Sequence, residues 1–404
     1  MGSLFALLYL AGRKVKQSAA PNNKGMMPLH EYRQTEWSQS IARGPYLNHA
    51  GVAPTPARVV QAVQEAIAWS GRDPEGFFLE GVMEARESAR QKMGRLLGAP
   101  PEEVAILKNT GQGLALVADA LRLEPGDNVV SVDCEYPSVV YPWYAQADRG
   151  IQTRLAPCRP DGAFTVDDIA ARMDARTRVL TLSWVQFSTG YRADLAAFAA
   201  LAHAHGALFV VDVIQGLGVL PLRSEEWGLD IVATGVHKWL LAPGGTGALY
   251  VAPHALEKMR LLNMGAAGVT DVAKFNPLAF APKPNAQRYE EGTPNGIGVF
   301  GLDAALGLIE DVGVDTIAAR VLALTAYAAT QIGRKGYQVL SPRDDHNRAG
   351  ILAFRHPAHD NTAVLDVLAA AGVTAAVRGG RLRFSPHFYN TEDDIDRAVA
   401  ALPA

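Results

Sequence analysis

Apolar residues follow two different spacings, which alternate along the chain from about residue 55 onward. Helical spacing covers residues 56–70, 80–97 and 195–205, and another predicted helix ends at Leu121. Short apolar runs predict strands at residues 103–107, 128–132, 178–183, 208–213, 231–234 and 247–251. The run at 208–213 is almost continuously apolar, as is typical of a strand buried on both faces of a parallel sheet. The pattern therefore predicts an α/β domain whose mostly parallel sheet is sandwiched by helices.

The pattern changes after residue 300. Helical segments at 301–312 and 316–335 precede predicted strands at 337–340 and 350–354, a helix at 362–371, strands at 373–377 and 382–385, and a last helix at 391–402. This order predicts a smaller C-terminal α+β domain over residues 301–404, which follows a large domain over residues 41–300. Residues 1–40 are expected to form an N-terminal tail and leader.

The leader contains an apolar run at residues 3–12. Its basic residues Arg13, Lys14 and Lys16 follow the run, whereas the positive charge of a secretory signal comes first. The run is also too short to span a bilayer. We expect a frayed or non-native leader, with a natural start near Met26 or Met27, and the alternative is a peripheral membrane contact.

Charge and cysteine content narrow the classes of function. The 404 residues include 38 basic and 41 acidic side chains, so their balance predicts neither nucleic acid nor an anionic membrane as a partner. Cys134 and Cys158 are the only cysteines, too few for a disulfide framework or a thiolate metal site. We therefore expect a reducing, cytoplasmic compartment and no bound metal.

Two ionisable side chains lie at the ends of predicted strands. Asp212 ends the apolar part of one strand, and Lys238 follows the strand at 231–234. Ligands of open α/β sheets bind beyond the carboxyl ends of the strands, so both groups are expected at one ligand site. Such a pair suits an aldehyde cofactor, because the lysine forms a Schiff base while the acid keeps the pyridine nitrogen protonated. On spacing alone, an ordinary ion pair at the rim of the sheet is the simpler explanation.

Two other segments are expected at the same edge. Residues 109–113 place Thr110 and Gly111 at a helix start, where N–H groups and a hydroxyl can hold a phosphate. Tyr136 follows a strand and could stack on an aromatic cofactor ring. Each alone also fits a structural role, as a common helix start or a half-buried core tyrosine. Neither a dinucleotide fingerprint nor a P-loop is present.

In their order along the chain, these segments resemble the class V aminotransferase family of fold type I pyridoxal phosphate enzymes. That family includes cysteine desulfurases, kynureninase and isopenicillin N epimerase. The resemblance covers about residues 45–400. Its segments are 46–51 (YLNHAG), 109–113 (NTGQG), 135–138 (EYPS), 183–190 (SWVQFSTG), 212–215 (DVIQ), 237–240 (HKWL), 291–295 (EGTPN) and 383–391 (RFSPHFYNT).

The resemblance implies how the cofactor is held. Lys238 would form the Schiff base and later move a proton at the substrate α-carbon, while Asp212 would pair with the pyridinium nitrogen. Gln215 would bond the phenolic oxygen of the ring. The phosphate would be held by Thr110 with the backbone around Gly111, and by His237 beside it. The large domain is accordingly expected to bind pyridoxal 5′-phosphate.

The resemblance also implies the partners of the site. Thr293 lies in a loop that reaches the phosphate of the neighbouring subunit in this family, so a homodimer with shared active sites is implied. Arg383 corresponds to the arginine that binds the substrate carboxylate, and Arg378 is a candidate to assist it. Residues 41–60 are expected at the active-site entrance, with Asn48 as a substrate contact. His49 is a candidate second acid or base, although a structural histidine is at least as good an explanation.

The chain departs from the desulfurases of this family in its cysteines. No cysteine follows Cys158, so none is available to take a persulfide in the C-terminal domain. Only residues 379–382 separate Arg378 from Arg383, too few for the mobile loop that carries the catalytic cysteine. Desulfuration by the usual route of the family is therefore not expected.

Other departures lie closer to the cofactor. Phe187 stands where desulfurases carry an asparagine, and Tyr136 with Pro137 replaces their paired histidines, which is more similar to the kynureninase arrangement. Gly235 replaces a phosphate-binding serine, for which Thr234 is a candidate substitute. A different reaction, or a bulkier and less polar substrate, would be consistent with these changes.

We predict a pyridoxal phosphate enzyme that acts on an α-amino acid bound as a Schiff base to the cofactor. The preferred reaction is a β-elimination of the C–S lyase type without a catalytic cysteine. Transamination comes next, followed by epimerisation or a specialised biosynthetic reaction. The alternatives from other classes are a nicotinamide-dependent oxidoreductase, whose glycine fingerprint is missing, and a non-catalytic scaffold, which would bind no aldehyde at Lys238.

Overall fold

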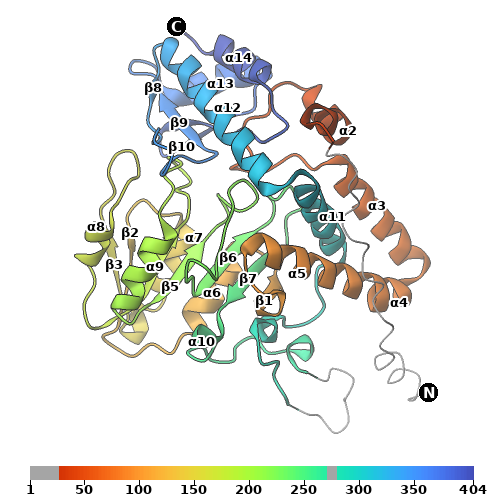
Figure 1. Cartoon of the computed structure of the whole chain (residues 1–404), viewed down its shortest axis with the longest axis vertical. Coiled ribbons are helices and arrows are strands. Elements are labelled where there is room, and N and C mark those ends of the chain that lie inside the picture. Colours follow the sequence, from red (N-terminus) through yellow and green to blue (C-terminus); the bar gives the residue numbers. More distant parts are fainter. Residues whose placement is uncertain (1–26, 271–279) are drawn as a thin grey trace.

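A seven-stranded sheet forms the centre of the large domain in this computed structural model, which describes residues 27–270 and 280–404 (Figure 1). The strand order is β1-β7-β6-β5-β4-β2-β3. Strands β2 to β6 are parallel, and β7 is antiparallel to both β1 and β6. The bounds are Val104–Leu107 (β1), Asn128–Val132 (β2), Gln152–Ala156 (β3), Thr177–Ser183 (β4), Leu208–Asp212 (β5), Ile231–Gly235 (β6) and Gly247–Val251 (β7). The prediction of a mostly parallel sheet is confirmed.

Helices surround this sheet. They are α3 (Ala57–Arg72), α4 (Pro74–Gly76), the π-helix η1 (Phe77–Val82), α5 (Met83–Leu97), η2 (Pro101–Glu103), α6 (Thr110–Ala120), α7 (Pro137–Tyr144), η3 (Ala147–Arg149), α8 (Val166–Ala170), α9 (Leu195–Ala204), α10 (Pro253–Leu256), η4 (Ala266–Gly268), η5 (Ala286–Tyr289) and α11 (Gly296–Val312). Strand β3 and helix α7 were not predicted. The residues of β3 are mostly polar and only partly buried, and the prolines of α7 are typical of turns.

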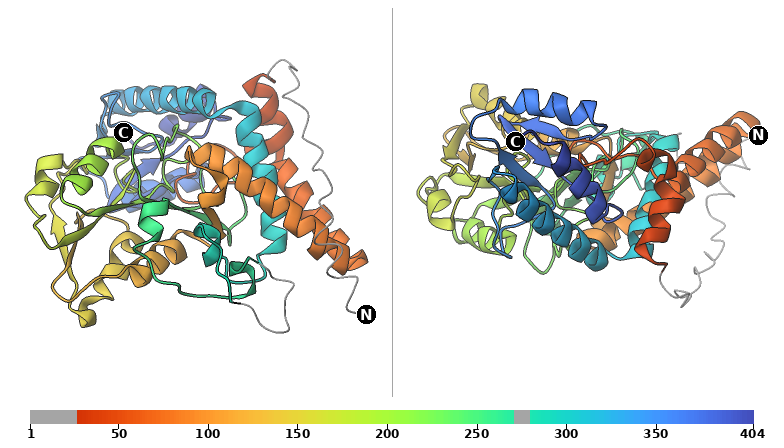
Figure 2. Two further views of the ribbon diagram at one scale, coloured as in Figure 1. Left: turned by 60° about the horizontal axis from the view of Figure 1, so that its bottom comes forward. Right: turned by 90° about the horizontal axis from the view of Figure 1, so that it is seen from above.

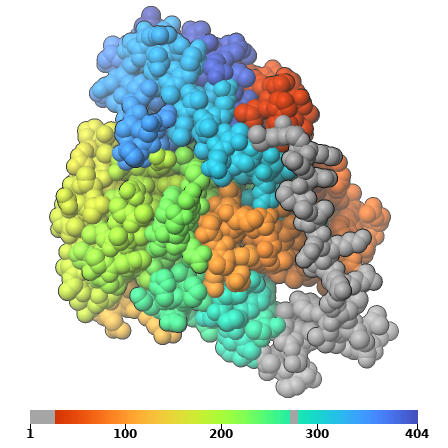
Figure 3. All heavy atoms as spheres, viewed as in Figure 1, coloured from red at the N-terminus to blue at the C-terminus, as the bar shows by residue number. Residues whose placement is uncertain are grey.

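The C-terminal residues form a second layer, which is drawn in blue on the large domain in Figure 3. Its antiparallel sheet has the order β10-β11-β9-β8, with its own apolar cluster around Phe354 and Phe384. Its elements are α12 (Val314–Arg334), β8 (Gln338–Val339), β9 (Leu352–Arg355), α13 (Asn361–Ala370), β10 (Ala376–Arg378), β11 (Arg381–Phe384) and α14 (Glu392–Ala401). The predicted helices and strands are present here, and every strand except β11 is shorter than the sequence indicated.

The first described helix, α2 (Leu29–Ile41), was not predicted (Figure 2). Its Trp37 is buried and stacks on Tyr389, with ring centroids 4.0 Å apart. Arg33 also forms an ion pair of 2.8 Å with Asp394. Contacts with the C-terminal part of the chain, more than 350 residues away, therefore stabilise this helix. The expected apolar leader lies outside the described residues.

The two cysteines are joined by a disulfide, with Cα atoms 6.0 Å apart. This bond was not predicted from the sequence, where two cysteines were judged too few for a disulfide framework. Strands β2 and β3 are parallel neighbours with Val132 opposite Ala156, and each cysteine lies two residues beyond one of these positions. The register thus brings Cys134 beside Cys158. Among the described residues, no helix is long and apolar enough to cross a membrane.

Candidate active site

A cavity of about 270 Å³ lies at the carboxyl ends of the parallel strands, where ligands of such sheets bind. Nine of the predicted site residues line it: Thr110, Gly111, Tyr136, Asp212, Gln215, His237, Lys238, Arg378 and Arg383. Four others, Asn48, His49, Thr234 and Thr293, do not line it. Most of the lining residues lie in segments that directly follow strands of the large sheet, and the β10–β11 hairpin of the small domain supplies the two arginines.

Asp212 and Lys238 both face this cavity. Asp212 is the last residue of β5, and its Oδ1 accepts a hydrogen bond of 2.9 Å from the N–H of Ile214. Burial raises the pKa of Asp212 to about 7, against the opposing effects of Ile214 and the Lys238 charge. Burial also lowers the pKa of Lys238 to about 8, although the Asp212 charge opposes that shift. A fraction of the amine is therefore neutral near pH 7, as a nucleophile or a base requires.

Two aromatic rings form a wall beside Lys238. The Nζ atom of Lys238 lies 5.6 Å from the centroid of the Tyr136 ring. Tyr136 in turn contacts the edge of Phe187, with centroids 5.3 Å apart. Both rings line the cavity, and Tyr136 is 42% exposed. A planar ligand in the cavity can therefore contact the Tyr136 ring.

Three groups converge where helix α6 begins. Thr110 begins α6, and its buried Oγ1 has no hydrogen-bond partner among the described residues. A Cβ atom on Gly235 would lie 3.0 Å from this Oγ1 and 3.5 Å from Nδ1 of His237. Glycine at position 235 thus leaves room between a free hydroxyl, an imidazole and a helix N-terminus. Such a set of donors suits a phosphate.

Thr234 does not belong to this set. Its side chain is buried, and its Oγ1 donates to the carbonyl of Gly235 at 3.0 Å. Successive side chains of a strand point to opposite faces, so Thr234 and position 235 cannot both face the cavity. The structure therefore does not place Thr234 as a substitute for the missing serine.

Gln215 is held by two hydrogen bonds. Its Nε2 donates to the carbonyl of Ala50 at 3.1 Å, and its Oε1 accepts from Nε1 of Trp239 at 3.0 Å. These bonds fix which end of the amide faces the chain segment at residue 50. One N–H of Nε2 is left for a ligand in the cavity.

Arg383 brings a buried positive charge to the cavity wall, although only 1% of the residue is exposed. Its Nη1 donates to the carbonyl of Phe187 at 2.8 Å, and its Nη2 donates to Oδ1 of Asn48 at 3.1 Å. Its Nε has no partner among the described residues. Burial, together with the charge of Arg378, lowers the pKa of Arg383 to about 9. Asn48 therefore orients Arg383, and the arginine has the free donor that a carboxylate ligand needs.

His49 is fully buried behind the cavity. Its Nδ1 lies 2.9 Å from the carbonyl oxygen of Ser385, and its Nε2 lies 2.9 Å from the hydroxyl of Tyr389. Burial, with the neighbouring His387, holds the pKa of His49 well below its usual value. Because both ring nitrogens have partners, the geometry favours the structural explanation of this histidine.

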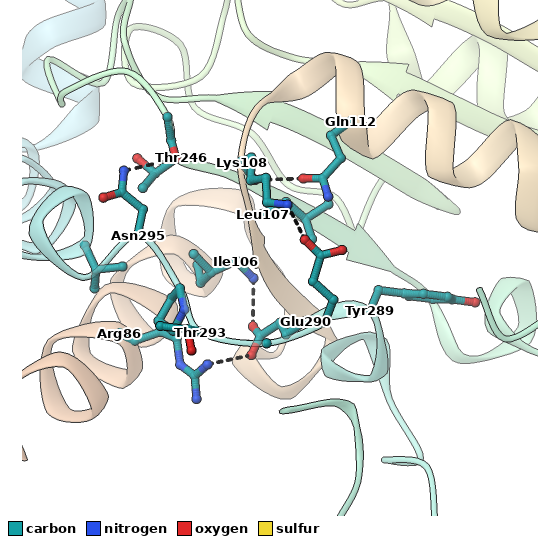
Figure 4. Close-up of a pocket in the computed structure, with 15 residues that line it drawn as sticks. Arg86, Ile106, Leu107, Lys108, Gln112, Thr246, Tyr289, Glu290, Thr293 and Asn295 are labelled. Atoms are coloured by element: carbon teal, nitrogen blue, oxygen red, sulfur yellow. Dashed lines mark hydrogen bonds and ion pairs between the residues drawn. The ribbon is translucent and has the colours of Figure 1, made fainter. Parts of the chain in front are cut away.

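Thr293 lines a separate, smaller cavity of about 50 Å³ (Figure 4). Lys108 and Thr246 lie in the same cavity. Its floor contains the buried carboxylate of Glu290, which accepts a hydrogen bond of 2.8 Å from the N–H of Ile106. Thr293 therefore does not reach the Lys238 cavity of its own chain.

Sequence reasoning missed one half-buried acid, Glu135, which directly precedes Tyr136 of the cavity wall. Glu135 directly follows the two residues after β2, and its Oε1 accepts from the N–H of Ser183 at 2.6 Å and from Nε2 of Gln186 at 2.8 Å. Burial raises the pKa of Glu135, and its charge contributes to the raised pKa of Asp212. The signal was present, because an acid shortly after an apolar strand is also how Asp212 was found.

The family model of class V aminotransferases matches residues 45–398. The chain belongs to the class V aminotransferase family. The chain is 29% identical over 357 residues to the uncharacterized aminotransferase YcbU of Bacillus subtilis, covering 88% of this chain and 92% of that protein. It is 31% identical over 339 residues to a cysteine desulfurase of Klebsiella pneumoniae, covering 78% and 81% respectively.

Solved structures show the same fold. The cysteine desulfurase CsdA of Escherichia coli matches with a TM-score of 0.82 and 25% identity, covering 93% of this chain and 97% of CsdA. The cystine C–S lyase C-DES has the same fold, with a TM-score of 0.83 at 22% identity over 89% of this chain and 97% of C-DES. The chain is thus a pyridoxal phosphate-dependent enzyme related to cysteine desulfurases. Its free Thr110 hydroxyl, the space at Gly235 and the buried Asp212 fit that cofactor.

Proposed function

We propose that this enzyme catalyses β-elimination from an α-amino acid, as a C–S lyase that uses no catalytic cysteine. The position of the cysteines carries the proposal. Cys134 and Cys158 are bonded to each other, and neither lines the Lys238 cavity. The β10–β11 hairpin turns through Gly379 and Gly380, whose positive φ values of 55° and 74° suit a tight two-residue turn. This turn leaves no loop between the strands for a mobile thiol.

The proposed roles of the residues follow from their positions. Pyridoxal phosphate, when bound, supplies an aldehyde for the amine and a ring that accepts the electron pair released at the substrate α-carbon. Asp212 would hold the ring nitrogen protonated, and Arg383 would bind the substrate carboxylate. Lys238, with its lowered pKa, would take the proton from the α-carbon. The C–S bond then breaks, the sulfur leaves with its electron pair, and hydrolysis yields a keto acid and ammonia.

The free donors at the start of α6 support a role in phosphate binding for three residues. Thr110, Gly111 and His237 would hold the phosphate, and Gln215 would bond the phenolic oxygen of the ring. Tyr136 would lie against the ring, since its exposed face borders the cavity.

We also propose a homodimer with shared active sites. Thr293 lies outside the Lys238 cavity of its own chain, which is consistent with a role toward a second subunit. Val60 and Ile67 on α3 are 41% and 54% exposed and offer apolar surface for association. Light scattering on the purified enzyme checks the mass, and a monomer would overturn this part. A cytoplasmic location stays a prediction.

The experiment begins with visible absorption of the enzyme with added pyridoxal phosphate. We expect a band in the violet that Lys238→Ala abolishes, with about a 1000-fold loss of activity or more. Lys258→Ala, at an exposed lysine, is the control and should keep both the absorption band and the activity. A colourless wild-type protein would overturn the assignment of Lys238.

The products then decide among the reactions. We expect a keto acid, ammonia and a released thiol from S-substituted cysteines, in the absence of any acceptor. A requirement for a keto-acid acceptor would instead establish transamination. Racemisation of the substrate without these products would establish epimerisation.

A further inference from the structure

Three arginines share one face of the β10–β11 hairpin. In the antiparallel register, Arg378 lies opposite Arg381, and Ala376 lies opposite Arg383. Side chains at opposite and diagonal positions of such a pair point to the same face. Arg378 and Arg383 line the Lys238 cavity, whereas Arg381 is turned aside and donates to the carbonyl of Pro160 at 3.0 Å.

The two arginines of the cavity have no carboxylate partner among the described residues. Arg383 donates only to a carbonyl and an amide oxygen. Arg378 donates to the carbonyl of Val377 at 2.8 Å. Asp212 is the only acidic residue among those that line the cavity. Two cations thus face a cavity whose lining contains a single carboxylate, that of the last residue of β5.

One substrate carboxylate does not account for both cations. A guanidinium binds a carboxylate with two parallel hydrogen bonds, so Arg383 alone can hold an α-carboxylate. Diagonal positions of an antiparallel pair are about 7–8 Å apart, a spacing that suits two separate anionic groups. The two charges also repel each other, since Arg378 contributes to the lowered pKa of Arg383. A second anion between or beside them would relieve this repulsion.

We propose that the substrate is an α-amino acid whose side chain ends in a carboxylate or another oxyanion, which Arg378 binds while Arg383 binds the α-carboxylate. For the reaction itself this inference rests on the proposed function, but recognition of the two anions does not depend on it. Phe187 and Tyr136 then contact the carbon chain of the substrate. Phe187 alone would favour a less polar substrate, and Arg378 adds a requirement for charge at its end.

The binding test uses unreactive acids on the holoenzyme. Glutarate and butyrate have similar carbon chains but carry two carboxylates and one. We expect calorimetry to show glutarate binding at least tenfold more tightly than butyrate. Arg378→Gln should abolish this preference and leave butyrate unchanged. Arg381→Gln is the matched control on the same face, and it should keep the preference.

The kinetic test compares S-carboxymethylcysteine with S-ethylcysteine. We expect the ratio of their kcat/KM values to favour the acidic substrate at least tenfold, and Arg378→Gln to remove most of that factor. Equal weakening of both substrates and both acids by Arg378→Gln would overturn the proposal, because Arg378 would then serve the α-carboxylate. If glutarate is preferred but neither cysteine derivative yields a keto acid, the proposed reaction fails and the recognition of two anions stands.

Discussion

The cavity is built from two regions that differ in construction. The edge of the large sheet supplies Asp212 and Lys238 at the ends of β5 and β6, which are buried at every position. The β10–β11 hairpin supplies Arg378 and Arg383 from strands of three and four residues. At the sheet edge, buried neighbours shift the pKa values of both groups toward neutrality. On the hairpin, one arginine is buried and the other is exposed.

This difference separates the chemistry of the enzyme from its selectivity. The groups at the sheet edge are fixed by packed backbone. They act in the steps that are common to all substrates of the cofactor. The two strands of the hairpin are joined by a two-residue turn, and their arginines place positive charge beside a ligand in the cavity. Changes at the edge should therefore act on the rate of reaction, and changes on the hairpin should act on substrate binding.

Asp212→Asn tests the sheet edge and should have the largest effect. An amide cannot hold a protonated ring nitrogen by charge, so we expect kcat to fall about 100- to 1000-fold with little change in KM. Asp366→Asn, at an exposed position on α13, is the control and should leave kcat unchanged. If kcat/KM fell only because KM rose, the sheet edge would act on substrate binding and the distinction between rate and binding would be wrong.

The same residue predicts a pH dependence of stability for the enzyme stripped of cofactor. The pKa of Asp212 is raised from 3.8 to about 7 in the folded state, so between these values the unfolded chain loses a proton that the folded chain keeps. The free energy of unfolding should thus decrease as pH rises from 4 to 7, by about 3–4 kcal/mol in all. Urea unfolding at several pH values should show this decrease relative to Asp212→Asn. Parallel curves for the two proteins would contradict it.

Removing the disulfide between Cys134 and Cys158 tests how the chain near Tyr136 is stabilised. The disulfide closes a loop with a sequence separation of 24, so replacing both cysteines by serine should lower the free energy of unfolding by about 3 kcal/mol. Because neither sulfur lines the cavity, we expect kcat to change by no more than about threefold. Thermal unfolding and steady-state kinetics measure the two effects. A large loss of activity at unchanged stability would show that the crosslink itself positions the site.

Arg383→Met tests the hairpin. Loss of a charge-assisted pair with the substrate should raise KM about 10- to 100-fold with a smaller change in kcat. Its buried charge has no carboxylate partner among the described residues, so removing it should not destabilise the fold. Arg381→Met, on the same face but outside the cavity, should leave KM unchanged. A loss confined to kcat would place Arg383 with the sheet-edge groups instead.

The residues of the sheet edge were predictable because apolar strands and their terminal polar residues are local in sequence. The run at 208–213 and the lysine that follows the strand at 231–234 indicate a shared edge, and the structure places both groups in one cavity. Glu135 carried the same signal. Strand β3 gave no such signal, because a polar edge strand lacks a continuous apolar run. Without β3, the pairing of the two cysteines could not be inferred.

The sequence by itself determined the alternation of strands and helices, the parallel sheet and the Asp–Lys pair, since each rests on the spacing of a few neighbouring residues. Only the tertiary structure decided that Trp37 packs on Tyr389, that Thr234 faces away from the cavity and that His49 is held between Ser385 and Tyr389. Those outcomes depend on register and on contacts between segments hundreds of residues apart. Burial, which shifts the pKa values of Asp212 and Arg383, comes from the same contacts.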